Sequence, residues 1–180
     1  PFCAVVGQTQ AKKALLLHAV NPLLRGVLLS GPPGTAKTTL IQGIAELLPK
    51  RKAIHIPVHV DEERLIGEWD ITNSIHHGER MFGKGLLAQA DGHLVTIDNA
   101  GRMPKRLLKM ILTAAESGYV EAESRTGYVL RPTRFRLYGT IDPEAGEPLT
   151  AMLDRWGLSV RLETSTDPAE RTKIVRRLFA

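Results

Sequence analysis

A glycine- and proline-rich stretch holds the residues of this sequence best suited to bind phosphate. GPPGTAKTT occupies residues 31–39, between an apolar run typical of a strand and a run with helical periodicity. A strand–loop–helix of this kind points successive backbone N–H groups, and the positive end of the helix, at a phosphate group. In such a loop Lys37 would place its charge on the β and γ phosphates, and the Thr38 hydroxyl would coordinate Mg²⁺. The stretch therefore predicts a site for ATP with Mg²⁺.

One position of this loop departs from the usual spacing, because Ala36 stands where a glycine normally precedes the lysine. A methyl group is small and compatible with a helical φ, so we expect nucleotide binding to survive. The alternative is a Gly/Pro turn that merely precedes a helix. The loop residues expected to contact the nucleotide are Gly31, Pro33, Gly34, Thr35, Ala36, Lys37, Thr38 and Thr39.

An apolar run that ends in an acidic residue provides the second half of a magnesium site. HLVTID, residues 93–98, predicts a buried strand, and Asp98 is suited to orient Mg²⁺ together with Thr38. Asp98 could instead cap the turn that follows it. Asn99 occupies the position where a glutamate normally polarises the attacking water. An amide cannot accept a proton, and loss of a general base lowers the rate by on the order of 10²–10⁴, so we expect binding with slow or absent hydrolysis.

The segment AVVGQ, residues 4–8, precedes the first predicted helix. Val6 and Gly7, with Val5, could form an apolar edge for the adenine ring, while backbone groups bind its polar edge. Packing in the core explains the same residues equally well.

Helical and strand-like segments alternate along the chain, which predicts a parallel α/β sheet flanked by helices. Strands are expected at residues 26–30, 53–60, 93–98, 134–141 and 158–163, and helices at 10–20, 38–48, 104–118 and 167–179. Residues 62–91 are too long for an ordinary connection, and residues 119–132 predict a β-hairpin. Both are expected to be insertions in one nucleotide-binding domain of residues 1–180.

Composition narrows the class of protein. The chain has 180 residues, 43% hydrophobic and 24% charged, and it contains no apolar run near the roughly 20 residues of a membrane helix. Cys3 is the single cysteine, which excludes an internal disulfide and favours a location in the cytoplasm. We expect Cys3 to be buried as a small hydrophobic residue. The net charge of +5 permits acidic partners. Basic residues gather at 102–109 and 170–177 as solvated helix faces without interleaved aromatics, so nucleic acid is not an expected partner.

Several segments, taken in chain order, resemble the AAA+ module of magnesium chelatase and, more broadly, of metal–tetrapyrrole chelatases. They are PFCAVVGQ, GPPGTAKTT, ERLIGEWDI with GERMFGKGLLAQADG, SGYVEAESRTGYVLRPTRF and DPEAGEPLTAMLDRWGLSV, which together cover nearly the whole chain. The resemblance implies a P-loop AAA+ fold with a helical insertion at about 62–91 and a β-hairpin insertion at about 119–132. It also implies a ring that uses ATP to insert Mg²⁺ into protoporphyrin IX in chlorophyll or bacteriochlorophyll synthesis.

This family has an active I-type motor subunit and a D-type subunit with an often degenerate AAA+ domain. Ala36, Asn99 and Asp142 favour the D type, since Asp142 in GTIDPE replaces the family's sensor 1 asparagine. A carboxylate there would repel the γ-phosphate unless a cation neutralises it. The resemblance assigns Arg155, in LDRWGLSV, as an arginine finger that acts on a neighbouring subunit's site. A surface ion pair of Arg155 with Asp154 or another nearby acid is the alternative.

The resemblance also implies partners, namely further ring-forming AAA+ subunits, as copies of this chain or I-type subunits, and a large porphyrin-binding subunit. The family's small helical lid is expected to be absent from this chain. Alternative functions are a hydrolysis-deficient nucleotide-binding scaffold for an active I-type subunit, a MoxR-like AAA+ chaperone and a DNA-acting AAA+ protein. His76 and His77 lack a third metal ligand at recognisable spacing, and Trp69 and Trp156 are expected in packing contacts instead of stacking on a porphyrin.

Overall fold

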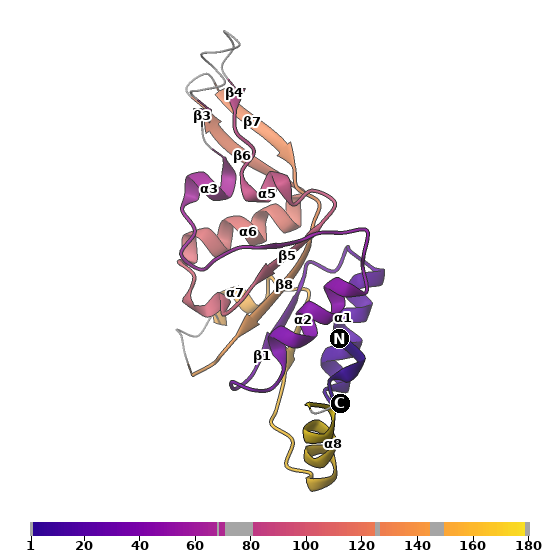
Figure 1. Ribbon diagram of the computed structural model, residues 1–180. Coiled ribbons are helices and arrows are strands. Elements are labelled where there is room, and N and C mark those ends of the chain that lie inside the picture. Colours follow the sequence, from indigo (N-terminus) through magenta and orange to yellow (C-terminus); the bar gives the residue numbers. More distant parts are fainter. Residues whose placement is uncertain (1, 68, 71–80, 125–126, 145–149, 179–180) are drawn as a thin grey trace.

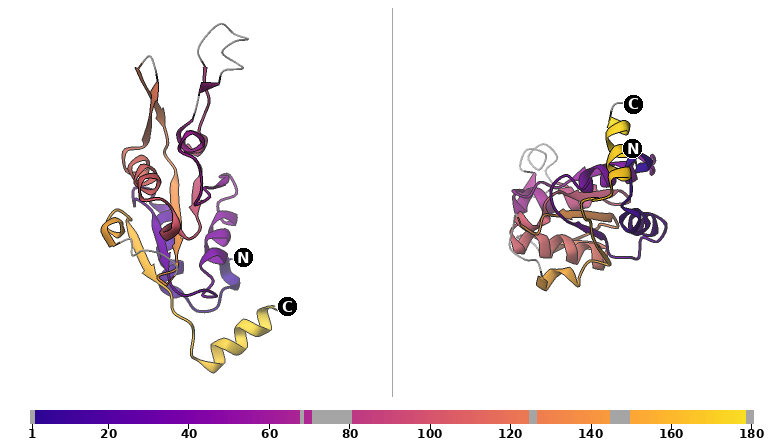
Figure 2. Two further views of the ribbon diagram at one scale, coloured as in Figure 1. Left: turned by 90° about the vertical axis from the view of Figure 1, so that its left-hand side faces the viewer. Right: turned by 90° about the horizontal axis from the view of Figure 1, so that it is seen from below.

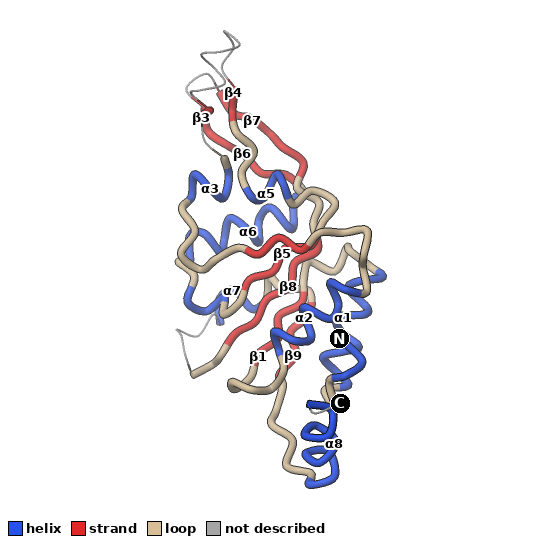
Figure 3. Tube along the Cα trace, in the orientation of Figure 1, coloured by secondary structure: helices blue, strands red, loops and turns tan. Residues whose placement is uncertain are grey.

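Five parallel strands form the centre of the computed structural model, which describes residues 2–67, 69–70, 81–124, 127–144 and 150–178 (Figures 1 and 3). Their order across the sheet is β2-β5-β8-β1-β9, and every pairing is parallel. The strands are β1 (Val27–Ser30), β2 (Ala53–His55), β5 (Leu94–Ile97), β8 (Arg136–Ile141) and β9 (Leu158–Arg161). The predicted parallel α/β fold is confirmed.

Helices cover both faces of this sheet (Figures 1 and 2). One face carries η1 (Phe2–Ala4), α1 (Thr9–Val20) and α2 (Lys37–Glu46), and the other carries α3 (Glu62–Ile66), α5 (Leu86–Gln89), α6 (Lys105–Ser117) and α7 (Thr150–Leu153). Because side chains alternate along a strand, Val27 and Leu29 pack with α1 and α2 while Leu28 packs with α6. Burial on both faces explains why the strands are continuous apolar runs.

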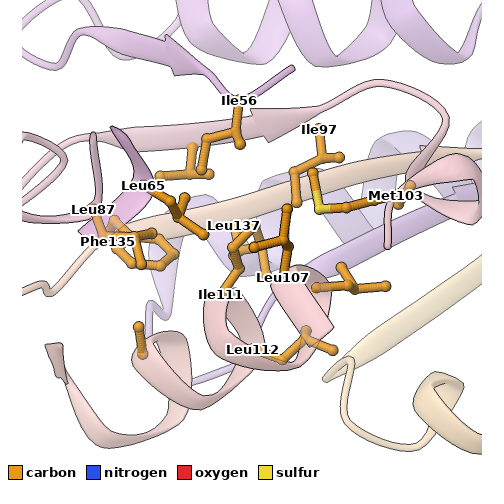
Figure 4. Close-up of a cluster of buried hydrophobic side chains, with 14 of the residues drawn as sticks. Ile56, Leu65, Leu87, Ile97, Met103, Leu107, Ile111, Leu112, Phe135 and Leu137 are labelled. Carbon is orange, nitrogen blue, oxygen red and sulfur yellow. The ribbon is translucent and has the colours of Figure 1, made fainter. Parts of the chain in front are cut away.

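The larger core cluster joins α6 to the sheet and to the first insertion (Figure 4). Leu107 and Ile111 of α6 lie against Ile97 and Leu137 of the strands, and the labelled side chains further include Ile56, Leu65, Leu87, Met103, Leu112 and Phe135. A fully buried side chain of this size contributes roughly 1.5–3 kcal/mol. The base of the first insertion, at α3 and α5, is therefore fixed to the domain by its own buried leucines.

Both predicted insertions project from the same end of the domain (Figure 1). The first contains the two helices α3 and α5 together with an antiparallel pair, β3 (Trp69–Asp70) and β4 (Met81–Phe82). The second is the expected β-hairpin of β6 (Tyr119–Ser124) and β7 (Gly127–Pro132). His76 and His77 lie outside the described residues, and Trp156 is buried in the core at 4% exposure, as expected of a packing residue.

One strand boundary and the burial of one cysteine differ from the sequence-based expectation. The strand expected at 53–60 ends at His55, because Pro57 has no backbone N–H to continue the ladder and a turn closes from Val60 N to Pro57 O at 3.2 Å. Cys3 is exposed, so its prediction as a buried hydrophobe is wrong. η1 turns the Cys3 side chain outward while Phe2 occupies the core.

The last helix, α8 (Pro168–Leu178), stands away from the sheet (Figure 2). Asp167 caps its first turn, since Asp167 Oδ1 accepts a hydrogen bond from Ala169 N at 2.9 Å. Its apolar residues Ile174 and Val175 remain 39% and 52% exposed, because no strand lies beneath them. Arg177 Nη1 ties its far end to the N-terminal segment through the carbonyl oxygens of residues 3 and 4, at 3.1 and 2.8 Å.

The basic helix faces predicted from the sequence are solvent-facing in the structure. Arg102, Lys105, Arg106 and Lys109 are exposed, and so are the basic residues of α8. Asp91 is exposed and accepts a hydrogen bond from Arg134 N at 2.9 Å. Within the described residues, no helix is long and apolar enough to cross a membrane.

A buried histidine on α1 makes the stability of the domain depend on pH. The ring of His18 lies edge-on to Tyr138, with centroids 4.9 Å apart. Burial, and then the charge of Arg136, lowers the pKa of His18 from 6.5 to about 4. Between these values the unfolded chain binds a proton that the folded chain does not, so the free energy of unfolding falls as pH falls, by up to about 3 kcal/mol at pH 4.

Guanidinium unfolding of the protein and of His18→Phe, from about pH 4 to 7.5, measures this effect. Carboxylates contribute equally to both proteins, so the difference between their curves isolates His18. We expect the variant to lose less stability in acid over the window below about pH 6.5. Parallel curves would show that His18 does not carry the effect.

Candidate nucleotide and magnesium site

The phosphate-loop residues form a turn of left-handed and extended backbone between β1 and α2. Gly31 has a φ of 154° and Gly34 a φ of 79°. A Cβ on Gly31 would lie 2.4 Å from Leu162 O, so only glycine fits beside β9. α2 begins at Lys37, and in the described chain no side chain caps its first N–H groups. These N–H groups and the positive helix end are placed to bind a phosphate.

Ala36 does not have the helical φ that the sequence analysis expected. Its φ is 66° and its ψ is 25°, a left-handed conformation immediately before α2. A Cβ in this conformation costs about 1–2 kcal/mol, and glycine avoids that cost. Alanine here therefore leaves the loop geometry intact at the expense of stability.

Ala36→Gly is expected to raise the free energy of unfolding by about 0.5–1 kcal/mol, since relief of strain outweighs the larger backbone entropy of glycine. Gly34→Ala is the matched control, because its φ is 79° and a Cβ there meets nothing within 4 Å. It introduces backbone strain alone and should lower stability by about 1 kcal/mol. Denaturant unfolding measures both, and a destabilised Ala36→Gly would contradict this explanation.

Lys37 lies over its own loop. Its Nζ donates to Gly31 O at 2.5 Å and to Pro32 O at 2.8 Å. Thr35 Oγ1 also donates to Pro32 O, at 2.9 Å, which holds the turn closed. A bound phosphate, which is charged, would be a stronger hydrogen-bond acceptor for the Lys37 ammonium than these carbonyl oxygens and would replace them. Lys37 therefore lies over the loop that the sequence analysis expects to bind phosphate.

Asp98 lies at the carboxyl end of β5, facing the start of α2. Its Oδ1 accepts hydrogen bonds from Thr38 Oγ1 at 3.3 Å and from the Thr140 hydroxyl. The N-cap residue of the following 3-10 turn η2 (Ala100–Arg102) is Asn99, and its side chain makes no capping hydrogen bond. Mg²⁺ bound to nucleotide typically takes one or two protein oxygens besides phosphates and water. The exposed Thr38 and Asp98 fit that requirement.

Asn99 has a left-handed backbone and an inward-facing amide. Its φ is 54°, a conformation that asparagine adopts more readily than most residues. Its N–H donates to Thr140 Oγ1 at 2.8 Å, and its Oδ1 is buried without a hydrogen-bond partner in the described part of the chain. The amide oxygen is thus withdrawn from the solvent from which a water would attack.

Asp142 follows β8 at the same edge of the sheet. β8 lies between β5 and β1, so Asp142 leaves the sheet between Asp98 and the phosphate loop. Asp142 is half-buried, and its Oδ1 accepts from Glu144 N at 3.1 Å. The structure therefore brings the loop, Asp98, Asn99 and Asp142 to one edge, from segments more than 100 residues apart.

Arg155 lies at the other end of the sheet. Its guanidinium donates to Glu116 Oε2 at 2.8 Å, to Glu116 Oε1 at 3.4 Å and to Thr113 Oγ1 at 3.0 Å. The hydrogen bond from Arg155 is the largest cause of the lowered pKa of Glu116. Arg25, which precedes β1, shares the same carboxylate at 3.5 Å. Since the phosphate loop follows β1, Arg155 cannot serve the site of its own chain.

A groove of about 1150 Å³ continues from the phosphate loop toward α8. Val6 and Gly7 line it from the N-terminal segment, and Ile174 and Val175 line it from α8. Its other contributors include Val5, Gln8, Thr35, Ala36, Thr39, Glu170 and Arg177. Apolar walls with a few polar groups suit a nucleoside. Val5 is buried in the core and also lines the groove, so its position is compatible with both expected roles.

A comparison with known proteins decides the family. The family model for the AAA domain of the dynein-related subfamily matches residues 26–155, which include the phosphate loop, Asp98 and Arg155. The chain belongs to the AAA domain family. Its strand order, loop and acidic strand end are thus the features of one known architecture.

This AAA domain is similar to magnesium-chelatase subunits. It is 32% identical over 214 aligned residues to the magnesium-chelatase subunit ChlI homologue of Methanocaldococcus jannaschii, covering 99% of this chain and 59% of that protein. It is 32% identical over 209 aligned residues to the magnesium-chelatase 38 kDa subunit of Cereibacter sphaeroides, covering 98% of this chain and 63% of that subunit. A cryo-electron-microscopy structure of the BchI–BchD complex of magnesium chelatase matches with a TM-score of 0.81 and 32% identity, over 98% of this chain and 65% of that one. The chain spans less than two thirds of each.

Sequence reasoning missed two parts of the AAA domain's site. Thr140 joins Asp98 and Asn99, yet a threonine inside a strand is typical of any sheet. α8 contributes Glu170, Ile174 and Val175 to the groove. One sequence feature pointed to this contribution of α8: its predicted helix carries apolar residues, and no strand was expected to cover them.

Proposed function

We propose that this AAA domain binds ATP with Mg²⁺ and acts as an AAA+ component of magnesium chelatase. In that role it would support ATP-driven insertion of Mg²⁺ into protoporphyrin IX in chlorophyll or bacteriochlorophyll synthesis. The observation that carries the proposal is the convergence of Lys37, Thr38 and Asp98 at one sheet edge in a chain similar to chelatase subunits. The 38 kDa relative and the BchI–BchD complex support the choice of chelatase.

In this proposal each element of the site has one task. The loop N–H groups, the helix start and Lys37 bind the phosphates, and the groove beside Val6 and Gly7 accepts the base and ribose. Thr38 and Asp98 hold the metal ion, which neutralises charge on the phosphates when bound. Asp98 keeps the Thr38 hydroxyl oriented through the hydrogen bond between them.

We propose further that intrinsic hydrolysis is weak and that the chain is a D-type subunit. Ala36, Asn99 and Asp142 support this assignment over the I type. The inward-facing Asn99 amide has no carboxylate to accept a proton from water, and the Asp142 carboxylate brings negative charge toward the γ-phosphate. The buried Asn99 oxygen also favours the second candidate function, a nucleotide-bound scaffold that organises an active I-type subunit.

The proposed partners are other ring-forming AAA+ subunits and a large porphyrin-binding subunit, in the cytoplasm. The position of Arg155 beside Glu116, away from the loop of its own chain, supports a role at a neighbour's site. The similarity to the BchI–BchD complex supports a ring that contains both kinds of AAA+ subunit.

Reconstitution of the chelatase reaction tests the proposed function. The full-length protein is mixed with the other chelatase subunits, protoporphyrin IX, Mg²⁺ and ATP, and formation of magnesium protoporphyrin is followed by its fluorescence. We expect metal insertion to require this protein and to be lost with Lys37→Ala, while Lys109→Ala on the exposed face of α6 retains it. Insertion that proceeds equally without the protein would reject the chelatase role and favour a MoxR-like chaperone.

A further inference from the structure

Thr140 is a buried hydroxyl residue that contacts both residues at the end of β5. It is 2% exposed. Its Oγ1 donates a hydrogen bond to Asp98 Oδ1 and accepts one from Asn99 N at 2.8 Å. Valine has nearly the same shape and would avoid burying a hydroxyl, which costs roughly 1–3 kcal/mol when its hydrogen bonds are lost. The hydroxyl at this position is therefore explained by its two partners.

The register of the sheet fixes this contact. β5 and β8 are parallel, with Ile97 opposite Gly139, so the next residues along, Asp98 and Thr140, lie across from one another. Side chains alternate along a strand, and Tyr138 packs on the α2 face of the sheet. Thr140 therefore faces the same side, toward the beginning of α2, where Thr38 lies.

The three hydrogen bonds have only one consistent direction. A backbone N–H always donates, so the bond from Asn99 takes an acceptor position on Thr140 Oγ1. The single hydroxyl proton is then committed to the Asp98 carboxylate. Thr38 donates to that same Oδ1 at 3.3 Å. The two hydroxyls together hold Oδ1 of Asp98, and with it the orientation of the whole carboxylate.

We propose that Thr140 is a positioning residue for the magnesium site. Its hydroxyl fixes the rotamer of Asp98 and the backbone of Asn99, so that ATP binds more tightly with Mg²⁺ than without it. Thr140 touches neither the nucleotide nor the metal and acts through Asp98. This inference rests on the proposed binding of ATP with Mg²⁺. It states that the extent to which Mg²⁺ tightens ATP binding depends on Thr140 of β8, although Asp98 follows a different strand, β5.

The test compares ATP binding in the presence of Mg²⁺ with ATP binding in EDTA, by calorimetry on the full-length protein. In Thr140→Val the ratio of the two affinities should fall about tenfold, while binding in EDTA stays within about twofold. Thr140→Ser keeps the hydroxyl and should keep the ratio. If Thr140→Val fails to fold, Thr140→Ala replaces it in the test. The alanine variant also removes the hydroxyl, but it leaves room for a water to accept the hydrogen bond of Asn99 N–H.

Asp98→Asn provides the second half of a double-mutant cycle. If Thr140 acts through the carboxylate, adding Thr140→Val to Asp98→Asn changes the Mg²⁺ ratio no further. An unchanged ratio in Thr140→Val, or an equal loss in Thr140→Ser, would overturn the positioning role alone. A wild-type protein that binds ATP in neither condition would overturn the proposed function itself.

Discussion

Asn99→Glu is expected to raise the rate of ATP hydrolysis by about 10²-fold. A glutamate at this position supplies the carboxylate that accepts a proton from the attacking water, and general bases contribute roughly 10²–10⁴. The native amide cannot accept that proton, and its oxygen is buried away from solvent. The longer side chain can reach outward from the left-handed backbone at φ 54°, at a cost of about 1 kcal/mol in stability. Steady-state release of phosphate measures the change.

Asn99→Gln is the matched control, because it lengthens the side chain equally but adds no base. Its turnover should remain within about threefold of the native protein, since no proton acceptor is gained. Equal rates of ATP hydrolysis in the glutamate and glutamine variants would show that the missing base at residue 99 is not what limits hydrolysis. Asn99→Glu combined with Asp142→Asn would then test whether the Asp142 carboxylate is responsible.

Arg155→Ala is expected to lower hydrolysis by about 10³-fold when introduced together with Asn99→Glu. An arginine supplied to a neighbouring site stabilises charge on the transferring phosphoryl group, an effect worth roughly 10³–10⁵ in rate. Loss of the pair with Glu116 cannot imitate this result, because an exposed ion pair contributes about 0–1 kcal/mol to stability. ATP affinity of the variant should be unchanged, since the side chain does not reach the loop of its own chain.

Mixing two inactive variants shows whether Arg155 acts between subunits. A chain with Lys37→Ala retains Arg155 but is expected to bind nucleotide at least about 10²-fold more weakly, and a chain with Arg155→Ala retains the loop. In the Asn99→Glu background, a mixture of the two chains should regain ATP turnover. Turnover returns at sites where the intact loop of the Arg155→Ala chain meets Arg155 of a neighbouring Lys37→Ala chain. Arg25→Ala removes the other arginine beside Glu116 and should stay within about twofold. A mixture that stays inactive, or an Arg155→Ala protein of full activity, would contradict the assignment.

Local sequence information was sufficient where one segment determines its own structure. The glycines of the loop, the apolar β1 and the helical periodicity of α2 and α6 predicted elements within a few residues of those observed. Asp98 was found because it ends an apolar run. The β-hairpin was found because its two strands flank a short turn.

Features that depend on distant partners could not be predicted in the same way. The contact of Thr140 with Asp98 joins positions 42 residues apart and depends on the register of two parallel strands. The left-handed φ of Ala36 follows from how the loop joins β1 to α2, whereas the residue type favours a helix. The exposed Ile174 and Val175 of α8 show that helical periodicity alone does not say what a helix packs against.

Calorimetric titration with ATP and Mg²⁺ tests the central claim, that Lys37, Thr38 and Asp98 form one site for a magnesium-bound triphosphate. We predict saturable binding to the native protein, and binding weakened by at least about 10²-fold in Lys37→Ala, equivalent to about 3 kcal/mol. Lys109→Ala removes an exposed lysine of α6 and should bind like the native protein. Absence of binding at saturating ATP and Mg²⁺, or equal affinity in Lys37→Ala, would contradict the account.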